Sequence, residues 1–168
     1  MRIAHCGRVL MPGVIVVCIN ACALSQSHSN DLSPTKAATL KKEILERTSA
    51  FSKAVLSASA SGWSAAQVAA LAEFYDDETI VFPPRAATLR GRESLRSYWT
   101  RPAERRILEH SAIAERVDAT NELATEYGKL RITYQVAEGP PARDSATYIS
   151  YWRRGGDGLW RKQLDTWW

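Results

Sequence analysis

Polar and apolar residues alternate most clearly in residues 144–168, at the end of the chain. Residues 147–153 and 159–167 are rich in aromatic and β-branched side chains, a composition typical of strands. The Gly-Gly-Asp-Gly segment 155–158 separates them, and glycines supply the positive φ angles that tight hairpin turns need. This pattern predicts a β-hairpin. Because a hairpin alone is marginally stable in water, we expect its tryptophans to pack against helices.

Helical periodicity precedes the strands. Residues 34–59 are predicted to form a helix, with Ser33 before it as the N-cap. A second helix is expected over residues 64–74 and a short third helix over residues 92–99. The apolar positions that define the first helix are Ala37, Leu40, Ile44, Phe51 and Val55.

Three more strands are expected before the hairpin. A short one over residues 79–82 follows Asp76 and Asp77, which are expected to end the second helix, and longer ones cover residues 107–117 and 123–136. Alternation divides the strand 123–136 into two faces. Thr125, Tyr127, Lys129, Arg131 and Thr133 share one face, and the other carries Ala124, Glu126, Leu130, Ile132 and Tyr134.

Helices followed by a run of strands predict an α+β fold class. The expected architecture is a curved antiparallel sheet wrapped on the N-terminal helices, a cone whose open end can hold a ligand. We expect one such domain over residues 34–168, because a chain of 168 residues fits one domain with a short appendage.

Residues 1–23 have the pattern of an export signal peptide. Arg2 and Arg8 precede an apolar run that Asn20 interrupts, and the run is too short for a comfortable transmembrane span. Residues 24–33 are polar and small, as expected of a linker. We therefore expect an exported protein of the periplasm or outer membrane, or a secreted one.

Two interpretations of the cleavage site remain open. Residues 21–23, Ala-Cys-Ala, satisfy the small-x-small rule of ordinary signal peptidase. Residues 19–22 also resemble a bacterial lipobox, which would make Cys22 the lipidated first residue. The only membrane contact expected is this lipid anchor.

Cysteine, histidine and charge usage exclude several function classes. All three cysteines fall within residues 1–23, so we expect no disulfide, cysteine nucleophile or thiolate metal site in the domain. His110 is the only histidine after His28, which argues against a histidine metal site or a Ser-His-Asp triad, and we expect it at the surface or an interface. Residues 1–21 carry Arg2 and Arg8 and no acidic residue, so the rest of the chain has 20 basic and 18 acidic residues. That near balance argues against a dedicated nucleic-acid binder. We expect no metal and no cofactor.

Several segments match, in order, the pattern of a known superfamily. They are Leu-Ala-Glu-Phe-Tyr-Asp-Asp at 71–77, Val-Phe-Pro-Pro at 81–84, Leu-Arg-Gly-Arg-Glu-Ser-Leu at 89–95 running into Tyr98-Trp99, Ala-Thr-Glu-Tyr-Gly at 124–128, Asp-Gly-Leu-Trp at 157–160 and Asp-Thr-Trp at 165–167. The sequence resembles the nuclear transport factor 2-like superfamily, with its SnoaL-like cyclases and ketosteroid isomerases, and looks closest to its uncharacterised exported branch. The resemblance implies the cone-shaped fold. It does not imply one function, because this fold carries enzymes, transport factors and dimerisation modules.

The resemblance also bears on one mechanism. In ketosteroid isomerases the strand after the Asp-Asp pair ends in Asp-Pro, and that aspartate is the general base. The corresponding pair here is Phe82-Pro83, and no tyrosine for the oxyanion hole occurs between Pro34 and Phe74. Steroid isomerisation by that mechanism is therefore not expected.

Asp165 is the candidate catalytic residue, since a carboxylate near the end of a tryptophan-lined strand suits a general acid or base. The alternative is that Asp165 pairs with a cation such as Arg131 or Arg161 and only fixes the sheet. Arg131 and Lys162 could hold an anionic or enolate oxygen, although strand cations commonly extend to solvent. The candidate ligand-binding residues are Phe82, Trp99, Tyr127, Arg131, Tyr148, Trp152 and Trp167. Plain packing is the alternative for the aromatic ones.

Two functions follow as expectations. In the first, the cone binds a small, largely apolar molecule, with or without an isomerase, cyclase or dehydratase-like proton transfer. In the second, side chains fill the cone, and the domain is a non-enzymatic envelope interaction module. We expect a homodimer packed through the sheet. A large cavity with converging polar groups would favour the first function, and a collapsed interior the second.

Overall fold

The computed structural model describes residues 32–100 and 105–168. The expected signal peptide 1–23, with Cys22, and most of the linker 24–33 lie outside the described residues. None of the helices in the described part is long and apolar enough to cross a membrane.

The helices are α1 (Pro34–Ala60), α2 (Ala65–Ala72) and α3 (Gly91–Trp99), close to the predicted ranges. Ser33 caps α1 as predicted: its Oγ accepts a hydrogen bond from the backbone N–H of Lys36 at 3.3 Å. Leu40, Ile44 and Val55 are buried on one side of α1, as the helical period requires.

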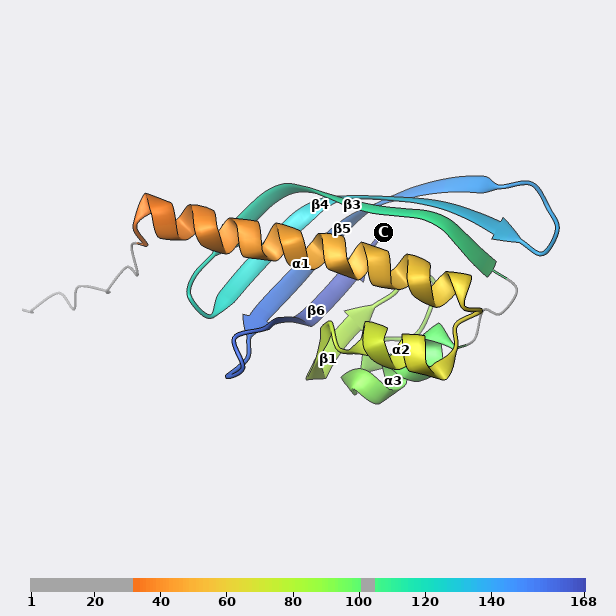
Figure 1. Cartoon of the computed structure of the whole chain (residues 1–168), viewed down its shortest axis with the longest axis horizontal. Coiled ribbons are helices and arrows are strands. Elements are labelled where there is room, and N and C mark those ends of the chain that lie inside the picture. Colours follow the sequence, from red (N-terminus) through yellow and green to blue (C-terminus); the bar gives the residue numbers. More distant parts are fainter. Residues whose placement is uncertain (1–31, 101–104) are drawn as a thin grey trace, which may run out of the picture.

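The strands are β1 (Tyr75–Phe82), β2 (Leu89–Arg90), β3 (Arg105–Ala119), β4 (Leu123–Val136), β5 (Ala142–Arg154) and β6 (Trp160–Trp167). They form one six-stranded sheet in the order β2-β1-β6-β5-β4-β3. The sheet curves around α1, which lies across one of its faces (Figure 1). The α+β fold class is therefore confirmed.

Two details of the prediction were wrong. The sheet is mixed rather than wholly antiparallel, because β1 pairs in parallel with β6. Asp76 and Asp77 lie within β1 instead of ending the second helix, which stops at Ala72. The strand begins earlier than predicted because Tyr75 is already buried in the sheet, while the Asp76 side chain forms an ion pair with Arg153 of β5 at 2.8 Å.

The core forms on both halves of α1. Toward its N-terminus, Leu40 and Ile44 pack against Trp152 of β5 and Trp160 of β6, so these hairpin tryptophans pack against a helix as predicted. Toward its C-terminus, α1 contributes Phe51, Val55 and Ala58 to a second cluster, which also contains residues of α2, β1 and α3. The elements α2, β1 and α3 lie together on the β6 side of the molecule (Figure 1). A cavity lined by Thr48, Phe51 and Val55 lies along this second half of α1.

Candidate functional site

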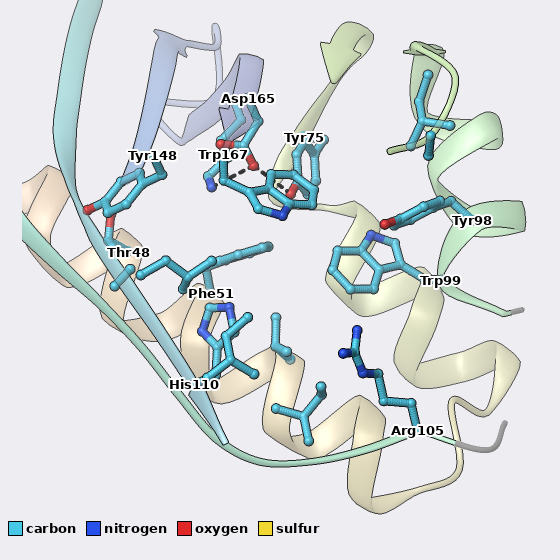
Figure 2. A pocket seen from close by; sticks show the side chains of 18 of the residues that line it. Thr48, Phe51, Tyr75, Tyr98, Trp99, Arg105, His110, Tyr148, Asp165 and Trp167 are labelled. Carbon is cyan, nitrogen blue, oxygen red and sulfur yellow. Dashed lines mark hydrogen bonds and ion pairs between the residues drawn. The ribbon is translucent and has the colours of Figure 1, made fainter. Parts of the chain in front are cut away.

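A cavity of about 470 Å³ lies between α1, the inner face of the sheet and α3 (Figure 2). Its wall is mostly apolar, with Phe51 from α1 and Leu130 and Ile132 from β4. Trp63 and Trp99 stack with ring centroids 5.4 Å apart and close one end. The volume falls in the range of about 300–1,000 Å³ that is typical of small-molecule pockets.

Asp165 of β6 is the centre of a buried polar cluster on the cavity wall. Its Oδ2 accepts hydrogen bonds from Lys162 Nζ at 2.9 Å and Tyr75 OH at 3.0 Å, and its Oδ1 accepts one from Ser150 Oγ at 2.7 Å. Asp165 and Lys162 are each only 4% exposed, so solvent screens their ion pair weakly. Burial, followed by the charge of Asp165, raises the pKa of Tyr75 well above its usual value, and the phenol remains a donor.

Lys162 and Asp165 share the cavity because β6 contains a β-bulge. In a regular strand, residues three positions apart point to opposite faces of the sheet. The two residues of β6 that flank Gln163 pair with consecutive residues of β5, so Gln163 is an extra residue in the ladder. A bulge of this kind changes which face the following side chains occupy.

Aromatic rings surround the ammonium group of Lys162. Its Nζ lies 4.2 Å from the ring centroid of Phe51, 5.4 Å from that of Trp152 and 5.7 Å from that of Tyr75. These faces add cation–π contacts to the ion pair with Asp165. The pair therefore presents a fixed dipole to whatever occupies the cavity.

His110 of β3 also lines the cavity, so its expected place at the surface or an interface was wrong. A register shift between Ile107 and Glu109 turns His110 inward. Its Nδ1 lies 3.0 Å from Ser52 Oγ, which leaves Nε2 for a ligand. Burial, followed by the charge of Lys162, lowers the pKa of His110 from 6.5 to about 4, so the ring is neutral at neutral pH.

His110 should make the domain less stable in mild acid. With a pKa of about 4 in the folded state against 6.5 for a free side chain, the unfolded chain binds more protons between these values, so stability falls as the pH falls through this window. Between about pH 6.5 and about pH 5 we expect a loss of about 2 kcal/mol relative to a His110→Gln variant. Urea unfolding of both proteins at each pH measures the difference, and equal losses in the two proteins would contradict it.

A second buried carboxylate, Glu126 of β4, lies behind the cavity wall and is 0% exposed. Its Oε2 accepts hydrogen bonds from Thr48 Oγ1 at 2.7 Å and Trp152 Nε1 at 3.0 Å, and its Oε1 accepts one from Tyr148 OH at 2.8 Å. Burial, followed by the charge of Glu126, raises the pKa of Tyr148 above its usual value. The Tyr148 hydroxyl points away from the cavity (Figure 2), so this residue offers a ligand its ring only.

The structure brings together part of the predicted site. The predicted residues that line the cavity are Asp165, Trp99, Tyr148 and Trp167. Trp152 is fully buried in the core with Leu40 and Ile44 instead. Phe82 is 43% exposed at the end of β1, and Tyr127 and Arg131 lie on the face of β4 opposite to Leu130.

The cation that pairs with Asp165 is Lys162, whereas Arg161 forms its ion pair with Asp157 at 2.7 Å. Sequence reasoning assigned no site role to Tyr75, His110 or Glu126. Alternation had already placed Glu126 on the same face as Leu130, and that signal could have marked it as an inward-facing carboxylate. In residues 32–100 and 105–168, no group of three or more His, Cys, Asp or Glu side chains could hold a metal ion.

Comparison with solved structures identifies the fold. A ketosteroid isomerase-like protein from Erwinia carotovora atroseptica matches with a TM-score of 0.58 at 16% identity, covering 74% of this chain and 95% of that one. An NTF2-like protein with a cystatin-like fold from Novosphingobium aromaticivorans matches with a TM-score of 0.60 at 18% identity, covering 82% and 89%. A protein from Catenulispora acidiphila, in complex with S-DNPA, matches with a TM-score of 0.62 at 13% identity, covering 77% and 92%.

These similarities show that the chain has the nuclear transport factor 2-like fold, and they confirm the predicted architecture. The identities are too low to transfer an activity, since one fold carries many functions. No family model and no curated protein matches the sequence.

Proposed function

We propose that this protein binds a small, largely apolar molecule in the cavity between α1 and the sheet. The observation that supports the proposal is the open, mostly apolar cavity of about 470 Å³, with a buried polar cluster on its wall. Ligand pockets combine a large apolar surface with a few placed polar groups in this way. A module whose interior is filled by its own side chains would have no such space.

One polar group of the ligand would contact the inner wall. The oxygens of Asp165 already accept three hydrogen bonds, so Asp165 acts mainly by holding Lys162 and Tyr75 in place. The Nε2 atom of His110 is then the group best suited to bind a ligand donor or acceptor, because a neutral imidazole can do either.

A proton-transfer reaction is a second candidate function. It is favoured by the neutral imidazole of His110, which lines the cavity near the Asp165–Lys162 pair. An isomerase, cyclase or dehydratase-like step would need no cofactor, with the pair stabilising a developing anionic oxygen. Deuterium uptake from D₂O into a retained ligand, absent in His110→Gln, would support this candidate, and equal uptake in both proteins would exclude His110 as the base.

Filling the cavity should abolish binding. Ala112 of β3 lines the cavity, and its neighbour Ile113 is exposed on the opposite face of the same strand. We expect native mass spectrometry of the protein purified from its own host to show a retained small molecule that is lost in Ala112→Phe and kept in Ile113→Phe. A molecule retained equally by all three proteins would contradict binding in this cavity. If none of the three retains a molecule, the interaction module is favoured.

The same spectra test two further proposals, export and homodimerisation. Export is supported by the signal-like pattern of residues 1–23, and the mass of the mature chain would reveal cleavage before Leu24 or a lipid on Cys22. A homodimer packed through the sheet is supported by Tyr127 and Arg131 on the outer face of β4. A monomeric, unprocessed chain would exclude both.

A further inference from the structure

The ionisable side chains on the cavity wall do not balance in charge. Burial raises the pKa of Tyr75, Tyr98 and Tyr148 and keeps these phenols neutral. His110 is neutral as well, and Asp165 and Lys162 cancel each other's charge. Among the described residues that line the cavity, Arg105 is left as an uncompensated positive charge.

Arg105 begins β3 and lies across the cavity from Asp165 (Figure 2). Its guanidinium stacks on the ring of Tyr134, with the carbon Cζ 3.6 Å from the ring centroid. Its backbone oxygen accepts a hydrogen bond from Trp63 Nε1 at 3.3 Å, which ties it to the tryptophan wall. These two contacts fix the position of Arg105, although the residue is exposed.

No carboxylate within residues 32–100 and 105–168 forms an ion pair with Arg105. Trp99, at the same end of the cavity, has a buried indole N–H without a hydrogen-bond partner in the described part of the chain. Unpaired buried donors are unfavourable, so a ligand that brings an acceptor would suit this end. An oxygen acceptor would satisfy the Trp99 N–H, and the positive charge of Arg105 favours an oxygen that is anionic.

We infer that the ligand of this cavity is an amphipathic carboxylate, with its apolar body against Phe51, Leu130 and Ile132 and its carboxylate on Arg105. The inference rests on the proposed function and narrows its ligand class. The planar guanidinium matches a carboxylate with two parallel hydrogen bonds. Arg105 and Asp165 lie on different sides of the cavity (Figure 2). A ligand whose carboxylate contacts Arg105 can therefore carry one neutral polar group at its other end, near His110.

A pair of probes of the same shape tests this inference. 1-Naphthaleneacetate and its neutral analogue 1-naphthaleneacetamide are titrated into the protein purified from its own host, and calorimetry gives both affinities. We expect the carboxylate to bind at least about tenfold more tightly, as for a charge-assisted bidentate contact. Arg105→Gln should bring the ratio close to one, because it weakens binding of the carboxylate more than binding of the amide. Arg106→Gln, which removes an equal charge from the neighbouring exposed position, should keep the preference.

The outcomes separate the inference from the proposed function. Equal affinities for the two probes, or a preference for the carboxylate that survives Arg105→Gln, would overturn the inference that the ligand is a carboxylate held by Arg105. Either result would leave the proposed function standing, with a neutral ligand. Failure of both probes to bind, together with mass spectra that show no retained molecule, counts against the cavity as a binding site.

Discussion

Replacing Asp165 by asparagine is expected to lower the free energy of unfolding by about 3–5 kcal/mol, because it leaves a buried lysine without its counter-charge. Lys162 is 4% exposed and aromatic rings surround its ammonium group, so it has little access to water in the folded state. The asparagine amide would also present a donor where Tyr75, Ser150 and Lys162 already donate. Urea unfolding followed by far-UV circular dichroism measures the loss.

The double variant Asp165→Asn/Lys162→Met is the matched control. It removes both charges, keeps a side chain of similar shape, and places a thioether among aromatic rings, a favourable contact. We expect it to recover more than half of the loss. Glu46→Gln, which breaks the exposed pair with Lys42, should leave stability unchanged. If the single variant is as stable as the wild type, or the double variant is no better than the single one, the buried pair is not what stabilises this wall.

Replacing Glu126 by leucine should cost at least about 3 kcal/mol of unfolding free energy, because each buried donor that loses its acceptor costs about 1–3 kcal/mol. Glu126 accepts hydrogen bonds from Thr48, Tyr148 and Trp152, and all of these contacts are buried. Through them it holds α1 against β4 and β5 behind the cavity. The change should therefore also weaken ligand retention in native mass spectra.

Glu126→Gln is the control for this change. Its amide oxygen can replace Oε2 and keep the bonds from Thr48 and Trp152, and its amide nitrogen can donate to the Tyr148 hydroxyl, which accepts as well as donates. We expect a loss of less than about 1 kcal/mol for this variant. Equal losses in Glu126→Gln and Glu126→Leu would mean that the negative charge, rather than hydrogen-bond satisfaction, is what matters at this position.

The sequence by itself determined the order and approximate limits of most elements. Periodicity located α1 from its cap at Ser33, and alternation with a glycine-rich turn located the β5–β6 hairpin. These signals are local, because a helix cap, a turn or a periodic apolar stripe depends on residues that are close together in the sequence. Asp165 was also singled out from sequence, as a carboxylate near the end of a tryptophan-lined strand, and the structure places it on the cavity wall. Its predicted catalytic role stays a prediction.

Only the tertiary structure decided which side chains meet in the cavity. A bulge at Gln163 reverses the alternation of β6 and places Lys162 beside Asp165, and a register shift before Glu109 turns His110 inward. The parallel pairing of β1 with β6 brings Tyr75 to the same carboxylate from a distant part of the chain. One extra residue in a strand moves every side chain that follows to the other face of the sheet. The local pattern of polar and apolar residues does not show where such a bulge occurs.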